Sequence, residues 1–471
     1  MLRWILGARE AQGTVEKSAA LFIGEEQPKN CFTEMQVLKG HFDIVRFLVQ
    51  IDDLRFASAG DDGLVLIWNV ETGELLLDLR GHTQQITAMT SYAYVRGGNT
   101  HTALITASSD RTLSLWDPDT GHRVQNVYDL QSSVKVCVRV FSSCVCTCLL
   151  IVCFLQCLLV LDRLDVWVSG GNELCVWNKD FELQCKTVHH SDTGISAMVE
   201  LPKNFIAAAM DREIVIFKLN VSGSDVAVMA MRHLTDHQDT IRSLINVNDG
   251  LFASGSHIGE LILWDSLHWT IHACEHILWE ESAGEGQSEV RLTNQKQIER
   301  SIQHMSSDGE LLVAAVGSGL YVYNVALKSV VAYRRIAHDS SVLHTMLQED
   351  GHMMSCSADG SVRMWELQDL PLPAEPASSG LFGMFGTFGR SSKQVCPPTK
   401  KLPEVSGLRS LELTGDLIGH SGAVQMFVSF KEKGLVTCST DHLLIVWRDG
   451  ELQSQLRSLA LFHKLEQNQG L

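Results

Sequence analysis

Short apolar runs separated by polar turns recur along this chain. The clearest unit spans 40–69, where apolar runs at 44–49, 55–59 and 64–67 are bounded by turns rich in Gly and Asp. Runs of this length that are rich in Val, Ile, Leu and Phe predict β-strands rather than helices. A Gly-His pair opens the unit, and a Trp followed by a small polar residue closes it. The pattern therefore predicts a small antiparallel sheet.

The unit recurs along the chain. The aromatic residues that close its eight copies are Trp68, Trp116, Trp177, Phe217, Trp264, Tyr323, Trp365 and Trp447. Their shortest spacings, 40 and 42 residues, match the period of about 40–45 residues expected for a four-stranded propeller blade. We therefore predict an all-β fold in which eight blades surround one axis. A strand over 33–38 is expected to complete the last blade, because that closure removes an exposed sheet edge.

Four copies share a further spacing, in which a His opens the unit and an Asp lies six residues before the Trp. A hydroxyl residue lies four before that Asp. The four sets are His41, Ser58, Asp62, Trp68; His82, Thr106, Asp110, Trp116; His338, Ser355, Asp359, Trp365; and His420, Thr437, Asp441, Trp447. These sets resemble the WD-repeat propeller family, in which such residues form a structural hydrogen-bond network. The tryptophan would supply buried apolar area and one N–H donor.

The remaining copies depart from this pattern. Phe217 and Tyr323 replace the closing Trp in the fourth and sixth copies, and Ile258 occupies the Asp position in the fifth. The fourth copy has no hydroxyl and Asp pair at the expected positions. We expect these three blades to be held more by packing than by polar networks.

His, Ser and Asp also suggest a hydrolase triad. A catalytic site needs one copy, whereas this set occurs four times with the same spacing, which favours the structural interpretation. The pair His189 and His190 lacks metal-ligand spacing. We therefore expect a protein that is not an enzyme, with no catalytic residues, no metal and no cofactor.

Composition narrows the range of partners and compartments. The formal net charge is −17, from 38 basic and 55 acidic residues, and the chain has no Lys/Arg-rich run. That pattern disfavours a nucleic acid as the main partner. The 13 cysteines, six of them within 137–157, suggest no disulfide framework, which fits a reducing cytosolic compartment. The N-terminal residues do not resemble a secretory signal.

The predicted organisation is a mobile N-terminal arm over 1–30, the propeller over 31–450 and a C-terminal helix over 451–471. Residues 140–161 carry no charge over 22 positions, which by length alone would suit a transmembrane helix. Three interpretations compete: a membrane span, a cysteine zinc site, or an insertion between the first two strands of the third blade. We favour the insertion, because removing about twenty residues restores an ordinary blade length.

Two segments are candidates for binding partners. Residues 368–408 contain six of the nine prolines, and their apolar tip at 381–390 either folds back on the propeller or enters a partner's pocket. The tip residues are Phe382, Met384, Phe385, Phe388 and Arg390. The predicted helix either packs on the blades or docks on a partner. Its apolar face comprises Leu452, Leu456, Leu459 and Phe462.

Several stretches resemble one branch of the WD-repeat family more specifically: 43–50, 163–167, 191–197, 243–249 and 382–389. The resemblance implies a non-enzymatic subunit of a cytosolic complex with two DENN-domain proteins, which acts on small GTPases and in autophagy. It also implies recruitment to lysosomes through a lysosomal cationic amino acid transporter, so that membrane association is indirect. We assign 381–390 to the transporter contact, and the N-terminal arm with the helix to the DENN contact. The alternative is a substrate adaptor of a ubiquitin ligase.

Overall fold

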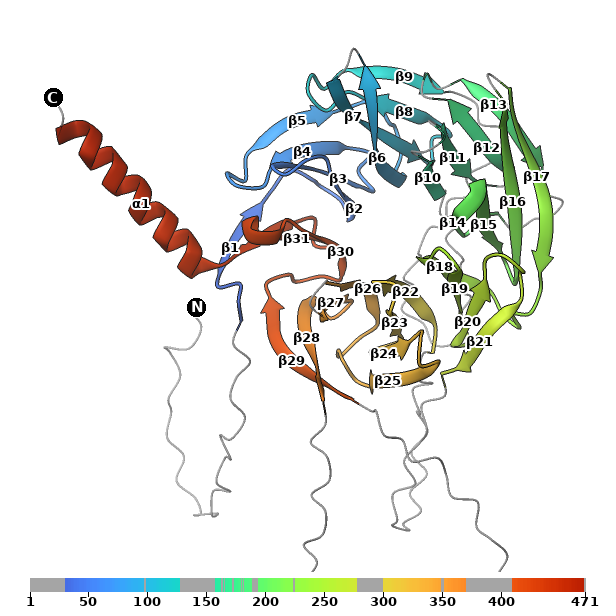
Figure 1. Ribbon diagram of the computed structural model, residues 1–471. Helices are drawn as coiled ribbons and strands as arrows, with labels where there is room; N and C mark the ends of the chain where they lie inside the picture. Colours follow the sequence, from blue (N-terminus) through green and yellow to red (C-terminus); the bar gives the residue numbers. More distant parts are fainter. Residues whose placement is uncertain are drawn as a thin grey trace, which may run out of the picture.

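The computed structural model describes residues 30–96, 99–127, 157–161, 164, 166–171, 173–178, 180, 182–188, 194–222, 225–277, 300–348, 351–369 and 409–469. The strands form eight four-stranded antiparallel sheets arranged as a ring (Figure 1). The predicted eight-bladed propeller is therefore confirmed. In blades one to seven the strands follow chain order from the inner strand outward.

The first four blades are each built from consecutive strands. Blade one holds β2 (Val45–Gln50), β3 (Arg55–Gly60), β4 (Val65–Asn69) and β5 (Leu75–Leu79); blade two, β6 (Ile86–Arg96), β7 (Asn99–Ser108), β8 (Leu113–Trp116) and β9 (Arg123–Val127); blade three, β10 (Cys157–Leu161), β11 (Val166–Gly170), β12 (Glu173–Asn178) and β13 (Leu183–Val188); blade four, β14 (Ala197–Leu201), β15 (Phe205–Met210), β16 (Glu213–Ser222) and β17 (Asp225–Leu234).

The next three blades follow the same order, and the eighth takes its outer strand from the N-terminal end. Blade five holds β18 (Ile241–Asn248), β19 (Leu251–Ser256), β20 (Glu260–Asp265) and β21 (Ile271–His276); blade six, β22 (Ile302–Ser307), β23 (Leu311–Val316), β24 (Gly319–Asn324) and β25 (Ser329–Arg334); blade seven, β26 (Val342–Leu347), β27 (His352–Ser357), β28 (Ser361–Asp369) and β29 (Arg409–Ile418); blade eight, β30 (Val424–Ser429), β31 (Leu435–Ser439), β32 (Leu444–Arg448) and β1 (Glu34–Leu38).

The ring closes where the N-terminal strand joins the last blade. Strand β1 pairs antiparallel with β32 in blade eight, from Glu34 opposite Arg448 to Leu38 opposite Leu444. Figure 1 shows β1 beside the last strands of the chain. The predicted closing strand is therefore confirmed, starting one residue later than expected. Pairing strands from both ends of the chain satisfies backbone groups that an open edge would expose.

The apolar core lies in the layers between neighbouring blades. Each closing aromatic residue packs against residues of the blade before its own, as Trp116 does with Ile67 of blade one and Trp365 with Val322 of blade six. All eight are buried, with at most 5 % of their surface exposed. Burial of such large side chains is the main stabilising contribution of a core, so these residues bind the ring together as well as closing their blades.

The apolar stretch 140–161 overlaps blade three. Its last five residues form the inner strand β10, which pairs with β11. Leu158 and Val160 pack towards blade two, whereas Leu161 is buried towards blade four. A strand covered on both faces reads as a continuous apolar run. The expectation that the whole stretch is inserted outside the sheet is therefore wrong for 157–161, and 140–156 lie outside the described residues.

The C-terminal helix α1 (Gly450–Gln469) begins directly after β32 and projects away from the ring (Figure 1). The Asp449 carboxylate caps it by accepting hydrogen bonds from the backbone N–H groups of Glu451 and Leu452, at 2.9 and 3.1 Å. The predicted helix at 451–471 thus corresponds to an element that starts one residue earlier. Within the described parts of the chain, no helix has the length and apolar character needed to span a membrane.

Candidate functional site

In blade one the predicted residues form a chain of hydrogen bonds. His41 Nδ1 lies 2.8 Å from the Asp62 carboxylate, and His41 Nε2 lies 2.7 Å from Ser58 Oγ. The indole N–H of Trp68 donates to the same Ser58 oxygen at 2.8 Å. Because the carboxylate only accepts, His41 carries its proton on Nδ1, and the Ser58 hydroxyl donates to Nε2. Every polar group in the chain therefore has a partner, as burial requires.

The same chain of contacts recurs in blades two, seven and eight. The distances from His Nδ1 to the Asp carboxylate are 3.2 Å for His82, 3.1 Å for His338 and 3.0 Å for His420. The Trp N–H groups donate to Thr106, Ser355 and Thr437 at 2.8, 2.8 and 3.0 Å. All sixteen residues singled out by the sequence thus come together in four sets.

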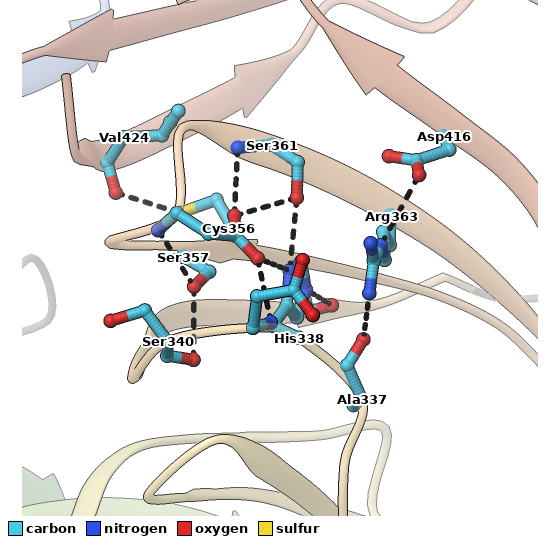
Figure 2. Close-up of polar contacts among 12 residues, drawn as sticks. Ala337, His338, Ser340, Cys356, Ser357, Ser361, Arg363, Asp416 and Val424 are labelled. Carbon is cyan, nitrogen blue, oxygen red and sulfur yellow. Dashed lines mark hydrogen bonds and ion pairs between the residues drawn. The ribbon is translucent and has the colours of Figure 1, made fainter. Parts of the chain in front are cut away.

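Blade seven shows how each set fixes the turns around it (Figure 2). The Ser361 hydroxyl lies 3.0 Å from His338 Nδ1, and the Ser357 hydroxyl donates to the Ser340 carbonyl at 3.1 Å. Arg363 donates to the Ala337 carbonyl and to the Asp416 carboxylate, at 2.6 and 3.3 Å. The network therefore extends from the closing Trp to the loop that enters blade seven and to its outer strand β29.

The carboxylates of these sets are held ionised. Burial raises the pKa of Asp62, but the hydrogen bond and electrostatic attraction of His41, with two backbone N–H groups, outweigh it, so the net pKa lies below its ordinary value. The pKa values of Asp110 and Asp359 are well below their usual range, because contacts with His82 and His338 outweigh burial in the same way. An ionised acceptor keeps the histidine proton on Nδ1 and so maintains the direction of the hydrogen bonds.

Blade five contains a fifth network that the sequence pattern missed. His237 Nδ1 lies 3.1 Å from the buried carboxylate of Glu260, His237 Nε2 lies 2.6 Å from Ser254 Oγ, and Trp264 donates to Ser254 at 2.8 Å. The expectation that packing rather than a polar network holds this blade is therefore wrong. Glu260 stands four residues before the Trp instead of six, and its longer side chain reaches the position that Asp62 occupies in blade one.

The other three blades lack the full set. In blade three, Trp177 donates to Ser169 at 3.0 Å, and among the described residues no histidine joins this pair. In blades four and six, Phe217 and Tyr323 are fully buried. The Tyr323 hydroxyl has no hydrogen-bond partner in the described structure. Burial, with a smaller contribution from the charge of Glu275, raises its pKa to about 12.

The buried networks do not have the geometry of a catalytic site. Ser58, Thr106, Ser355 and Thr437 have no exposed surface, and each hydroxyl is already bonded to a Trp and a His. A substrate therefore has no access to these oxygens, whereas a nucleophile must reach the reacting atom. Over the described ranges, no three His, Cys, Asp or Glu side chains are gathered around a possible metal position. The residues that the sequence suggested for chemistry instead stabilise the ring.

The exposed partner-binding candidates lie around the closing strand and α1. Leu456 and Leu459 are 50 and 56 % exposed, and Leu452 is half-buried. The side chain of Phe462 lies outside the described residues, as do the loop residues Phe382, Met384, Phe385, Phe388 and Arg390 and the arm 1–29.

Two contacts attach α1 to the closing strand of the ring. Arg457 forms an ion pair with Glu34 of β1 at 2.9 Å, and the Gly450 N–H donates to the Thr33 hydroxyl at 3.1 Å. On β1 itself, Met35 and Val37 are also exposed. The helix and the closing strand therefore each expose apolar side chains.

Arg448 fixes this region to blade one and was not anticipated from the sequence. Its buried guanidinium donates to the Gln36 side chain at 2.9 Å, and to the carbonyls of Val70 and Glu71 at 2.6 and 2.9 Å. Burial lowers its pKa, partly offset by the charges of Glu34 and Glu71. One side chain thus ties β32, β1 and the first blade together immediately before α1.

Known proteins support the same architecture. The chain is 52 % identical to WD repeat-containing protein 41 of Homo sapiens, and the match covers 99 % of this chain and 98 % of that protein. It is 50 % identical to the Mus musculus protein of the same name, with the same coverage.

Two solved structures share the fold at low sequence identity. The computationally designed Ika8 protein superposes with a TM-score of 0.56 at 16 % identity, covering 88 % of this chain and 98 % of that one. Saccharomyces cerevisiae Sqt1 gives a TM-score of 0.60 at 12 % identity, covering 87 % and 97 %. At this identity, the likeness concerns the fold alone.

A family model described as WDR41 matches residues 1–146 and 151–457. The match therefore runs through the apolar stretch 140–161 except for residues 147–150. It also includes the closing strand, all eight blades and the first residues of α1. With this coverage, and with relatives that are at least half identical along the whole chain, the protein belongs to the WDR41 family of WD-repeat β-propellers.

Proposed function

We propose that this protein is the non-enzymatic scaffold subunit of a complex with two DENN-domain proteins that regulates small GTPases and autophagy. It acts in the cytoplasm and recruits the complex to the lysosomal surface by binding a cationic amino acid transporter in the lysosomal membrane. Its own membrane association is indirect. The proposal is supported by membership of the WDR41 family and by the resemblance of the stretches quoted from the sequence.

The observation that carries the scaffold proposal is the contrast between the polar networks and the apolar surface at α1. The five His-containing networks are buried and stabilise the propeller. Leu456 and Leu459, in contrast, remain exposed on a helix that projects from the ring (Figure 1). Leaving such side chains in water is unfavourable, and exposed apolar patches commonly mark protein interfaces. The ion pair between Glu34 and Arg457 holds this helix next to the closing strand. We therefore place the DENN contact on α1 and β1.

Replacing both Leu456 and Leu459 with Ser should weaken co-purification with the DENN partners by at least tenfold, because each leucine is expected to bury apolar area in the complex. The matched control is Leu327→Ser, which changes a leucine that is 66 % exposed on the turn between β24 and β25. Unchanged co-purification of the double variant would refute the placement of this contact.

A charge swap tests whether the helix has to be held against the closing strand. Arg457→Glu places two acidic groups together and should weaken the DENN contact, whereas the double variant Glu34→Arg with Arg457→Glu restores an ion pair and should recover it. Failure of the double variant to recover binding would show that Arg457 acts by itself and not through Glu34.

The transporter contact is placed on 381–390, which lies outside the described residues. Deleting 381–390 should abolish lysosomal recruitment and leave the DENN complex intact. A deletion of equal length within 391–400, in the same Pro-containing segment, serves as the control. Recruitment that survives loss of the apolar tip would refute this assignment. Proximity labelling in the same cells tests the alternative of a ubiquitin-ligase adaptor, which predicts ligase subunits instead of DENN proteins among the labelled neighbours.

A further inference from the structure

A cavity of about 280 Å³ lies on blade one, at the end of the sheet where the turn between β2 and β3 meets the turn between β4 and β5. The cavity is open to solvent and is lined by Asp52, Asp53, Leu54, Arg55, Asn69 and Leu76. The backbone N–H of Val70 donates to the Leu54 carbonyl at 2.8 Å and holds the two turns together. The polar network of this blade does not involve any of the lining residues.

The cavity carries an excess of negative charge. Arg55 is the one cation among the lining residues, and its Nε lies 2.7 Å from the Asp52 carboxylate. Its terminal nitrogens bind the Asp119 carboxylate at 2.8 Å and the Pro118 carbonyl at 3.1 Å. The carboxylate of Asp53 is exposed and has no hydrogen-bond or ion-pair partner among the described residues. A further cation that enters the cavity therefore meets one carboxylate that is not neutralised.

Two leucines give the same cavity an apolar wall. Leu54 and Leu76 are 40 and 42 % exposed. A register shift between Ile67 and Trp68 leaves Leu76 as the extra residue of a β-bulge in β5, and bulges redirect side chains. Lysine and arginine pack their methylene stems on apolar groups while the charged end stays at a polar rim. Exposed leucines beside an unpaired carboxylate fit a side chain of that kind.

The cavity is next to the strand on which we place the DENN contact. The side-chain oxygen of Asn69, in the cavity wall, accepts a hydrogen bond from the Thr72 N–H at 2.9 Å. Gln36 of β1 donates to the Thr72 carbonyl at 3.0 Å, and Arg448, just before α1, donates to the Glu71 carbonyl at 2.9 Å. A single turn therefore separates the cavity from the closing strand, so that a partner seated on β1 can reach it.

We propose that this cavity receives a lysine or arginine side chain of the partner that docks on α1 and β1. The placement of that partner rests on the proposed function, whereas the choice of a cation rests on the cavity itself. The charged end of the side chain pairs with Asp53, and its methylene groups pack on Leu54 and Leu76. The formal net charge of −17 attracts a basic surface from a distance, and the cavity fixes the position of one of its cations.

The test measures the dissociation constant between the full-length chain and the purified DENN partners at low and at physiological salt. Asp53→Lys should weaken binding at least tenfold, because two cations then face each other. Asp53→Asn should weaken it about two- to fivefold, as expected for one exposed ion pair, and this loss should shrink at the higher salt concentration. The matched control is Asp249→Lys, which makes the same change in net charge at an exposed aspartate on the corresponding turn of blade five, between β18 and β19.

The outcomes separate this inference from the proposed function. If the double variant of Leu456 and Leu459 loses binding but Asp53→Lys does not, the DENN contact stands and the cavity is not part of it. Equal losses in Asp53→Lys and Asp249→Lys also overturn the cavity, because they show only general electrostatic attraction. Absence of binding by the wild type overturns both proposals.

A second variant tests the apolar wall without changing the charge. Leu76→Ser should weaken binding about threefold at both salt concentrations, because the methylene stem loses a packing partner. Unchanged binding would overturn the packing of the stem in this cavity. Thermal midpoints that match the wild type show that each variant is folded.

Discussion

Blades one, two, five, seven and eight differ from blades three, four and six in how they treat polar groups. The first five bury a hydrogen-bonded network of Trp, hydroxyl, His and carboxylate groups. Blades four and six instead bury an aromatic residue among aliphatic ones. Both kinds form a four-stranded sheet in the same ring. The polar network is therefore not required for a four-stranded blade to form. Packing of the closing aromatic residue against the preceding blade is the feature that all eight share.

Blades four and six lack both the hydroxyl and the indole donor of the network. Ala208 and Ala314 stand on β15 and β23 where β3 has Ser58, and Phe217 and Tyr323 lack the indole donor. Removing both partners of a buried hydrogen bond is nearly neutral, whereas removing one leaves the other unpaired. This explains why the hydroxyl and the indole donor are missing together in blades four and six. Tyr323 is the exception, because its buried hydroxyl is left without a partner.

The largest effect is expected where a blade depends on packing alone. Phe217→Ala should lower the free energy of unfolding by about 3–5 kcal/mol, because it opens a cavity in the layer between blades three and four. Chemical denaturation monitored by fluorescence gives the value. A loss below about 1 kcal/mol would mean that the closing aromatic residue is not what holds this blade.

Variants of blade five test whether its polar network stabilises the blade as a unit. Glu260→Ala should cost about 2–3 kcal/mol, because it leaves His237 buried without its carboxylate partner. Adding Ile258→Asp places a carboxylate six residues before Trp264, as in the other networked blades, and should recover part of that loss. Denaturant midpoints of the single and double variants provide the comparison. No recovery would show that the turn of blade five, and not side-chain length, selected glutamate.

A matched pair of smaller changes isolates the contribution of the indole N–H donor to the free energy of unfolding. Trp365→Phe keeps an aromatic ring but removes the N–H group that Ser355 accepts, and should cost about 1–2 kcal/mol. Tyr323→Phe removes a hydroxyl that has no partner and should be neutral or stabilising by up to about 1 kcal/mol. Thermal unfolding of the two variants side by side measures the difference. Equal losses would contradict the distinction between the two kinds of blade.

Acidification should destabilise the ring through two buried histidines of blades six and seven. His304 and His344 lie with their ring centroids 4.1 Å apart and their planes tilted by 33°, on the inner strands of blades six and seven. Burial lowers the pKa of His304 to about 4, and burial together with the charge of His304 places that of His344 well below its usual value. Below the ordinary pKa of about 6.5, the unfolded chain therefore binds more protons than the folded chain.

The stability contributed by these two histidines should be fully present above about pH 6.5 and be lost as the pH falls towards 4. Denaturant unfolding at pH 7, 6 and 5 measures the decline, which should be shallower in the double variant His304→Gln with His344→Gln. His338→Gln is the comparison from a networked blade, because it removes a histidine that has Asp359 as a partner. An unchanged pH dependence in the double variant would exclude this pair as the source.

The amino-acid sequence determined the architecture because the repeat is local. The strands, the turns and the closing aromatic residue of a blade all lie within one short stretch of sequence. Eight blades, four polar networks and the closing strand could therefore all be predicted. Prediction from residue spacing failed at Glu260, because a longer side chain reaches the histidine from a different position in the sequence. It also failed at 157–161, because an apolar run fits either a buried strand or an insertion. An inner strand buried on both faces and an inserted apolar segment look alike until their neighbours are placed.

Contacts between distant segments were decided only by the tertiary structure. Arg448 donates hydrogen bonds to the carbonyls of Val70 and Glu71, and Arg457 donates to the carboxylate of Glu34. The partners in each case are more than 370 residues apart in the sequence. No period in the sequence links such positions, because they become neighbours only when the last blade returns to the first. The direction in which α1 leaves the ring, and therefore the surface it offers, is set by that closure.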